Sequence, residues 1–519
     1  MTAVSSRDYV AADATDDERQ LIAGARSFVA DAMRVTRTPG LSIAVARNGR
    51  VMWEAALGYA NLARGIAMTT DNTWPGASFA KVYVATAVLQ LVEERLLDLY
   101  APIRTYVPEL DVRNPLGARE VTLYDLLTHT SGLAFSTAHP RLEPEKGLSE
   151  HLIDVFRQAH RLEYRLKLPL WTARVGARYQ YSSLGIATAG YIVERTNRDA
   201  LSFADFVDQR IAEPLGLKAT AFRGPAAPDR FPEGLEARRC TGYMAFGSVM
   251  IPTPILYSAG SPAGGLLTTP GDQARLLLVF TKGGRANGSA LLDPSTVRMM
   301  TTPQSRMDDA EAPAGAWTNG LGFEINDAGK RSMHFGHGSG QQWGWYSHCA
   351  AFPADETVVV VCTNRWDMTR YTNPPSEIAP GLTTTFIRRW LDGDEAARAR
   401  ASRETDWAWK ASYMMGAMMV ERVHAFLGAP GAIPDETISR LAAEAHVDAQ
   451  DATKSWVPDA FRMGAEEMMR VEPTADAVRD FFASGRGCVT GADLPLLGLW
   501  FGRRAGLSVP HTAITGVQH

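Results

Sequence analysis

Cysteine is scarce in this sequence. The 519 residues include only four, Cys240, Cys349, Cys362 and Cys488. They are scattered, form no Cys-x-x-Cys motif and have no histidine at ligand spacing, so a disulfide framework and a zinc site are both disfavoured. We expect four buried thiols, no metal and no cofactor.

Long hydrophobic runs are also missing. No stretch of about 18 uncharged apolar residues occurs, so nothing in the sequence is suited to span a bilayer. The first 20 residues are rich in Asp and Arg and contain no apolar run of the length that a secretory signal needs. The sequence therefore predicts a cytoplasmic protein without a membrane partner.

An excess of one charge is the third feature that is absent. The chain has 53 Lys plus Arg against 57 Asp plus Glu, a formal net charge of -4. Phosphate binding normally requires a basic excess, so nucleic acid is not an expected partner. Apolar residues make up 45% and charged residues 21%, as in globular proteins with a large core. At roughly 100 to 200 residues per domain, we expect one large domain and smaller additions.

The pattern along the chain divides it into three parts. Residues 1–35 are interpreted as a polar tail and a helix. Residues 36–394 form the main domain, which begins with two strand-like runs, 40–46 and 51–56, on either side of Asn48-Gly49. Asn-Gly is a strong hairpin signal because both central residues of the tight turn need positive φ. A periodic apolar stretch over 78–97 predicts a buried helix.

Strand signals return at the end of this domain, at 321–325, 333–335, 343–352 and 357–362. Mixed helical segments and loops fill about 100–255, and 273–280 is helix-like. This order predicts an α/β (α+β) fold, in which an antiparallel sheet built from both ends of the domain is flanked by helices and a helical subdomain. Residues 395–519 are rich in helix formers and are interpreted as an appended helical region. Its Met-rich stretch, 413–419, fits a packed helix face or a substrate lid.

The first candidate for chemistry is Ser78-Phe79-Ala80-Lys81, where a Pro-Gly turn enters the predicted helix. Side chains at i and i+3 share a helix face, so the lysine amine can reach the serine oxygen. Lysine can accept the serine proton only when it is neutral, so its pKa must fall from about 10.4. The alternative is a helix N-cap serine followed by a surface lysine.

Two more patches carry chemically useful groups. Tyr181-Ser182-Ser183 supplies a phenol and hydroxyls just before a helical run over 186–193. Residues 333–340 place His337 and several glycines at the end of a strand, where glycine exposes a main-chain amide that can stabilise an oxyanion. A core tyrosine and an ordinary loop histidine are the alternatives for these two patches.

Taken in order, the three patches resemble the serine beta-lactamase and penicillin-recognising family, which uses Ser-x-x-Lys, then Tyr-x-Asn or Tyr-x-Ser, then Lys/His-x-Gly on a strand. The resemblance runs from about Pro39 to Leu391 and does not include the C-terminal helices. Further stretches similar to the family are TLYDLLTHTSGL (122–133), PLGL (214–217), AGGL (263–266) and NGLGF (319–323).

The resemblance implies a role for each position. Ser78 is expected to be the nucleophile, and Lys81 and Tyr181 to share its proton, with Tyr181 passing it to the leaving group. The backbone amides of Ser78 and Gly340 are expected to form the oxyanion hole. His337 is expected to be a further catalytic residue. It stands where many beta-lactamases have lysine, which favours the esterase and D-peptidase branches of the family.

Two positions depart from the family pattern. Ser183 replaces the asparagine that helps beta-lactamases bind a substrate amide, and Ser339 occupies the expected glycine position of the third patch. Both are candidate substrate-binding residues, and Ser339 leaves the oxyanion donor open. His129, within LLTHTSGL, is interpreted as structural.

Aromatic residues follow the third patch closely. Trp343 and Trp345 are predicted to share one face of a strand. They can form a wall for a bulky apolar acyl group, since each buries about 150 to 250 Å². Packing in the core of the sheet is the alternative.

These observations favour a metal-free serine hydrolase that works through an acyl-enzyme on Ser78. We expect a short peptide with unusual or D residues as its substrate, and the family includes a peptidase for linearised microcystin. A carboxylesterase or acyltransferase acting on small esters is the alternative. A ligand-binding protein that keeps the fold without catalysis is a further alternative, and self-association of the chain stays open.

Overall fold

The computed structural model describes residues 5–36, 38–134, 147–159, 170–222, 234–246, 249–253, 260–286, 289–306, 317–326, 334–337 and 344–367. The predicted C-terminal region, 395–519, and its Met-rich stretch lie outside these residues, as do Cys488, Ser339, Gly340 and Trp343.

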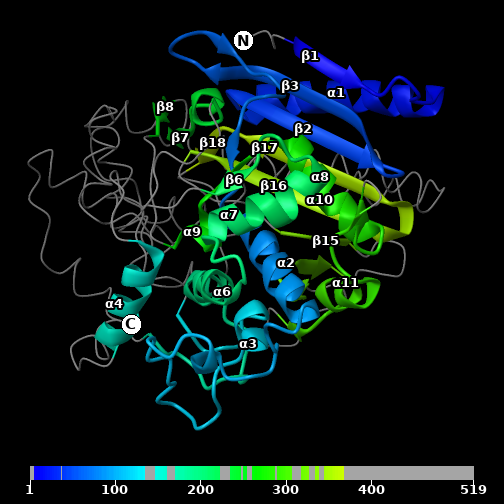
Figure 1. The fold of residues 1–519 in the computed structure, drawn as a ribbon. Helices are drawn as coiled ribbons and strands as arrows, with labels where there is room; N and C mark the ends of the chain where they lie inside the picture. The colour runs from blue at the N-terminus through cyan, green and yellow to red at the C-terminus, as the bar shows by residue number, and fades with distance from the viewer. Residues whose placement is uncertain are drawn as a thin grey trace, which may run out of the picture.

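A ten-stranded antiparallel sheet forms the centre of the described structure (Figure 1). Its order is β1-β3-β2-β17-β16-β15-β14-β13-β12, and β4 pairs with β3. The sheet therefore joins strands from both ends of the main domain, as the sequence predicts. The strands are β1 (Ser5–Val10), β2 (Gly40–Arg47), β3 (Arg50–Asn61), β4 (Ile66–Ala67), β12 (Ser305–Arg306), β13 (Trp317–Asn319), β14 (Glu324–Asn326), β15 (His334–Gly336), β16 (Tyr346–Phe352) and β17 (Thr357–Thr363).

The β2–β3 hairpin confirms the turn prediction. Asn48 and Gly49 both have positive φ, 51° and 82°, as a tight turn between twisted strands requires. β2 also pairs with β17, so that Ser42 lies opposite Cys362. The run of valines in β17 is buried throughout, because helices cover both faces of the sheet at this point.

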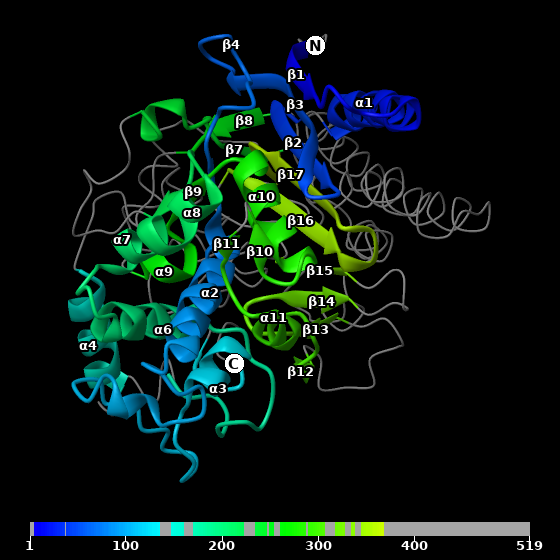
Figure 2. The ribbon, with the colours of Figure 1, turned by 45° about the vertical axis from the view of Figure 1, so that its right-hand side comes forward.

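One helix covers the outer face of the sheet and another covers the inner face (Figure 2). On the outer face, α1 (Asp16–Thr36) packs Ile22, Ala25 and Val29 against Val359 and Val361 of β17. On the inner face, α10 (Pro270–Thr281) contacts β2, β3, β16 and β17.

The N-terminal segment differs from its prediction as a polar tail before a helix. β1 pairs with β3 and extends the edge of the sheet, and α1 contributes to the outer core. The strand lies at the edge of the sheet, and Tyr9 and Val10 are its only large apolar residues, so its sequence signal is weak.

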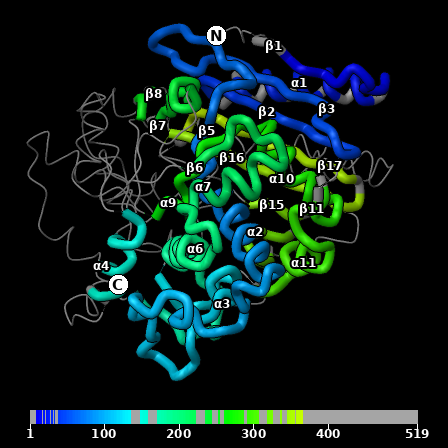
Figure 3. The backbone as a smooth tube through the Cα atoms, in the orientation of Figure 1, coloured from blue at the N-terminus to red at the C-terminus, as the bar shows by residue number. Residues whose placement is uncertain are grey.

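Figure 3 shows α2 (Ala80–Glu93) among the helices beside the sheet. It is buried along almost its whole length. It contacts α6 (Ser183–Thr196) and α9 (Ser261–Gly264). The helix ends four residues before the predicted Leu97, because Arg95 adopts a left-handed φ of 59° that stops it. The other helices are α3 (Leu123–Leu127), α4 (Leu148–Ala159), α7 (Phe203–Val207), α8 (Glu213–Leu215) and α11 (Pro294–Met300).

Small sheets and short helical turns connect these parts. One sheet has the order β5-β9-β6, a second has the order β18-β7-β8, and a third is β10-β11. Their strands are β5 (Trp74–Pro75), β6 (Ala221–Phe222), β7 (Tyr243–Phe246), β8 (Val249–Pro252), β9 (Leu266–Thr268), β10 (Arg285–Ala286), β11 (Ser289–Ala290) and β18 (Arg365–Asp367). The short turns are η1 (Ala77–Phe79), η2 (Ile103–Thr105), η3 (Asp208–Ala212), η4 (Glu236–Arg238) and η5 (Pro353–Asp355). Within the described residues, no helix combines the length and the hydropathy needed to cross a membrane.

Candidate active site

Ser78 lies where the β5 segment turns into α2. It belongs to the short 3-10 turn η1, and the α-helix begins at Ala80. The preceding residue, Ala77, has a φ of 40°, an uncommon conformation for a residue with a Cβ that is often found at functional turns. Gly76 and Phe79 are the N-cap residues of η1 and α2, so Ser78 is not the helix cap of the alternative interpretation.

Lys81 is fully buried one turn along from Ser78, which rules out the surface lysine of the same alternative. Its Nζ donates to Ser78 Oγ at 3.0 Å and to the Ala263 carbonyl oxygen at 2.8 Å. Burial lowers the pKa of Lys81 to about 7, because the charged amine has lost its water, and the nearby Glu324 carboxylate opposes this effect. A substantial fraction of the amine is therefore neutral near neutral pH.

Tyr181 reaches the same serine from the segment that precedes α6. Its side chain forms a hydrogen bond with Ser78. The Lys81 amine lies 4.8 Å from the centre of the tyrosine ring. Burial raises the pKa of Tyr181 well above 10, so the phenol keeps its proton at neutral pH.

His337 follows β15 and completes the group. It is buried, and its ring centre lies 6.1 Å from that of Tyr181. Cys349 of the neighbouring β16 supports its backbone, because Sγ lies 3.5 Å from both the nitrogen and the oxygen of His337. The structure thus brings Ser78, Lys81, Tyr181 and His337 together from three distant segments.

The remaining predicted residues divide into two groups. Gly340, Ser339 and Trp343 lie outside the described residues. Ser183 begins α6, two positions after Tyr181, and is partly buried. Its neighbour Ser182 is the N-cap of this helix and accepts the Gly185 backbone N–H at 3.0 Å, which fixes the end of the Tyr181 segment.

Trp345 packs as a core residue. Only 3% of its surface is exposed, and its indole N–H donates to the Cys240 carbonyl oxygen at 3.1 Å. The ring lies against Gly242, where an added Cβ would come within 2.5 Å of it. This position corresponds to the sheet-core interpretation and does not place Trp345 on a substrate wall.

Three residues at the site are not recognised as site residues in the sequence. Ala263 contributes only its carbonyl oxygen, which no side-chain motif can reveal. Glu324 acts on Lys81 through its charge. His129 stacks on Tyr181 with ring centres 4.5 Å apart, although its motif suggests only a structural part. The AGGL, NGLGF and LLTHTSGL stretches that contain or border these residues were the available signals.

Two further features of the described residues concern the cysteines and possible metal ligands. Cys240, Cys349 and Cys362 are free and buried, as predicted for thiols of the core. In the part of the chain that the structure describes, no group of three His, Cys, Asp or Glu side chains is arranged to hold a metal ion.

The sequence was compared with known protein families. The sequence matches the Beta-lactamase family over residues 25–379, which is more than half of the chain. The chain therefore belongs to the beta-lactamase family. Esterases, amidases and penicillin-binding proteins stand among its relatives by name, which agrees with the sequence prediction of a serine hydrolase.

Two curated relatives show how the similarity is distributed. The esterase EstB of Burkholderia gladioli is 34% identical over 222 residues, which cover 41% of this chain and 55% of the esterase, so the chain spans only about half of that relative. The N-acetylmuramyl-L-alanine amidase of Bacillus subtilis is 28% identical over 336 residues, which cover 60% of this chain and 72% of the amidase.

A solved structure shares the fold. The D-amino acid amidase of Ochrobactrum anthropi SV3 superposes with a TM-score of 0.54 at 22% identity, covering 75% of this chain and 99% of the amidase. At this identity the likeness establishes the fold, which agrees with the antiparallel sheet and flanking helices described above.

Proposed function

We propose that this protein is a serine hydrolase that forms an acyl-enzyme on Ser78. The observation that supports this most directly is the hydrogen bond of 3.0 Å between Lys81 Nζ and Ser78 Oγ, made by an amine whose pKa burial lowers to about 7. A lysine in this state can accept the serine proton at neutral pH, and a solvated lysine cannot.

The proposed acylation has a simple order. Neutral Lys81 accepts the Ser78 proton as Oγ forms a bond to the substrate carbonyl carbon. The amides of Ser78 and Gly340 are the proposed donors to the resulting oxyanion. Tyr181 donates its proton to the leaving alcohol or amine as the carbonyl carbon–heteroatom bond breaks, and it recovers a proton from Lys81. Water then attacks the carbonyl carbon of the acyl-enzyme and gives its proton to Lys81. The bond between this carbon and Ser78 Oγ breaks, the acid is released, and Lys81 returns the proton to Oγ.

The proposed substrate is the amide bond of a short peptide with unusual or D residues, a class that includes linearised microcystin. The amidase and penicillin-binding relatives support this choice, since their similarity covers 60% and 64% of the chain. His337 at the third patch, where many beta-lactamases have lysine, supports it as well. His337 is a further proposed catalytic residue. Ser183, Ser339 and Trp343 are the proposed contacts for this substrate. We place the activity in the cytoplasm as part of the same proposal.

Small esters are the second candidate substrate. The esterase relative has the higher identity, 34%, although over a shorter segment. The acyl-enzyme chemistry is the same for both substrates and differs only in the group that leaves, so an ester does not change the residues involved.

The test compares wild type with Ser78→Ala on p-nitrophenyl acetate and butyrate, nitrocefin, D-amino-acid anilides and a short peptide containing D residues. We expect kcat/KM of the variant to fall by about a thousandfold or more on each substrate that wild type cleaves. The preferred substrate then distinguishes amidase from esterase. If wild type cleaves none of them and a fluorophosphonate does not label Ser78, the chain is a binding protein and the mechanism is wrong.

Assembly is a separate part of the proposal. A solved homologue from Pyrococcus abyssi, with a TM-score of 0.56, is described as octameric. Self-association of this chain is proposed by analogy, and its mass in solution by light scattering decides the question.

A further inference from the structure

We infer that His129 is a positioning residue that holds the Tyr181 hydroxyl on Ser78, and that it does so as a neutral imidazole with an unprotonated Nδ1. The inference rests on the proposed acyl-enzyme function. His129 lies in the turn after α3, more than 50 residues before Tyr181 in sequence, and only 2% of its surface is exposed.

The two residues that flank Tyr181 both donate their backbone N–H to His129. The N–H of Gln180 donates to the His129 carbonyl oxygen at 2.6 Å. The N–H of Ser182 donates to His129 Nδ1 at 3.1 Å. His129 therefore holds the main chain on both sides of Tyr181. A shift of the tyrosine Cα would break at least one of these two hydrogen bonds.

The imidazole ring also restrains the phenol ring. The two ring centres are 4.5 Å apart with an angle of 34° between the planes. Tyr179 also contacts the imidazole, in an edge-on arrangement with the ring centres 5.7 Å apart. The backbone hydrogen bonds fix the position of the Tyr181 main chain. The contact between the rings fixes the direction in which its hydroxyl points.

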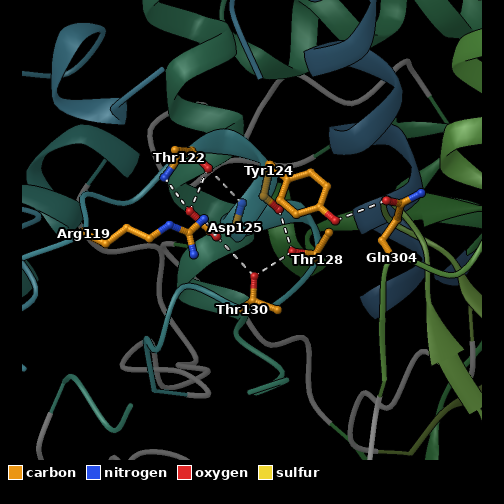
Figure 4. Close-up of polar contacts among 7 residues, drawn as sticks. All are labelled: Arg119, Thr122, Tyr124, Asp125, Thr128, Thr130 and Gln304. Atoms are coloured by element: carbon orange, nitrogen blue, oxygen red, sulfur yellow. Dashed lines mark hydrogen bonds and ion pairs between the residues drawn. The ribbon is translucent and has the colours of Figure 1, made fainter. Parts of the chain in front are cut away.

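The turn that carries His129 is itself rigid. His129 has a φ of 57°, a left-handed conformation. On one side, Thr128 Oγ1 donates to the Tyr124 carbonyl oxygen at 2.7 Å. On the other, Thr130 Oγ1 donates to Asp125 Oδ1 at 3.3 Å, and the two threonine hydroxyls lie 2.9 Å apart (Figure 4).

The helix below this turn is fixed in the same way. Asp125 and Thr122 form a capping box at the start of α3. The buried carboxylate of Asp125 also pairs with Arg119 at 2.8 Å, and Tyr124 donates its hydroxyl to Gln304 at 3.2 Å (Figure 4). His129 therefore sits on a support that is satisfied on both sides, as a precise positioning role requires.

The hydrogen bond from Ser182 determines the state of the ring. An Nδ1 that accepts an N–H must carry a lone pair, so the neutral ring has its proton on Nε2 and a doubly protonated ring would oppose one N–H to another. Burial lowers the pKa of His129 well below 6.5, and Lys81 and His337 lower it further when they are charged. The ring consequently stays neutral over the range in which Lys81 titrates.

The test uses two variants that separate the acceptor from the ring. His129→Asn keeps an acceptor oxygen near the place of Nδ1 and tolerates the left-handed backbone. His129→Phe keeps an aromatic ring and loses the acceptor. Each is measured for kcat/KM on an alkyl ester and on a p-nitrophenyl ester with the same acyl group, in the wild-type and Tyr181→Phe backgrounds.

We expect His129→Phe to lose about tenfold or more on the alkyl ester, whose leaving group needs the Tyr181 proton, and much less on the p-nitrophenyl ester. His129→Asn should recover most of this loss, and His129→Phe should add little in the Tyr181→Phe background. Equal losses on both esters, or losses that multiply in the double variant, would overturn the inference.

Two controls separate this inference from the proposed function and from misfolding. Fluorophosphonate labelling of wild-type Ser78 tests the function itself, so a negative result there rejects the acyl-enzyme and not the positioning role. If His129→Phe does not fold, the ¹⁵N chemical shifts of His129 in wild type still decide: a proton on Nδ1 contradicts the inference, and an unprotonated Nδ1 with a proton on Nε2 supports it.

Discussion

In the proposed mechanism, Lys81 sets the pH at which the site can work. Its proton must be absent for it to accept the proton of Ser78, and burial places its pKa at about 7. We expect kcat/KM to rise about tenfold per pH unit below this value and to level off above it, because kcat/KM reports the ionisation of the free enzyme. A pH profile on a p-nitrophenyl ester measures the midpoint.

Glu324→Gln is the matched variant for this profile. The carboxylate favours the charged amine and raises the pKa of Lys81, so its removal should shift the rise in activity to lower pH. The variant should then be more active than wild type at pH 6 and similar at pH 8. A shift to higher pH would show that Lys81 is not the group that titrates.

Single residues also show where sequence reasoning stops. Ser78, Lys81, Tyr181 and His337 could be proposed because each lies in a short motif with a known spacing, and the structure brings them together. The contact of His129 with Tyr181 joins segments some 50 residues apart. The LLTHTSGL motif singles out His129, but nothing in the motif shows that its ring meets Tyr181. Trp345 shows the converse, since an aromatic residue next to a motif serves the core.

At the scale of elements, the NGLGF turn before β14 holds the start of α2. Gly322 has a φ of 78°, and a Cβ there would lie 2.5 Å from Ala85 Cβ and 3.1 Å from the Lys81 carbonyl oxygen. Neither the turn nor the helix can move away to make room for this Cβ, because both are buried. The turn therefore fixes the height of the lysine relative to the sheet.

Gly322→Ala should accordingly destabilise the protein by about 2–4 kcal/mol, the sum of the left-handed strain and the overpacking. Activity should fall with it, because α2 carries Lys81. Gly65→Ala is the control: its φ is 62°, but an added Cβ meets nothing within 4 Å, so only about 1 kcal/mol of strain is expected. Urea unfolding of both variants gives the difference, and equal losses would mean that the contact with α2 is unimportant.

Elements with local signals were predictable from the sequence. Asn48-Gly49 located the β2–β3 hairpin, and apolar periodicity located α2. β1 was missed because its pairing with β3 is decided by a distant strand and not by its own composition. The end of α2 was misplaced because apolar residues continue past Arg95, where the backbone turns.

At the scale of the molecule, α1 closes the outer face of the sheet. Ala25 is fully buried against the strands, whereas Ala23 on the same helix is exposed. A carboxylate at position 25 would lie among apolar side chains without a partner, which is costly.

We expect Ala25→Asp to destabilise the protein by about 3 kcal/mol or more and to promote aggregation. Ala23→Asp introduces the same residue into the same helix and should change stability by less than about 0.5 kcal/mol. Thermal unfolding with light scattering compares the two variants. If they behave alike, α1 does not cover the sheet in solution.

The central pairing of β2 with β17 has a consequence for biosynthesis. Ser42 and Cys362 are neighbours in the sheet but are separated by roughly 300 residues of chain. At translation rates of about 5–20 residues per second, β2 waits on the order of 15–60 s for its partner to leave the ribosome. During that interval the β2–β3 hairpin exposes an unpaired apolar edge, and Ser78 has been made before His337 exists to join it. The nascent chain is thus an inactive intermediate that is prone to aggregate. The proposed site is complete only after His337 and the strands β15 to β17 have been synthesised.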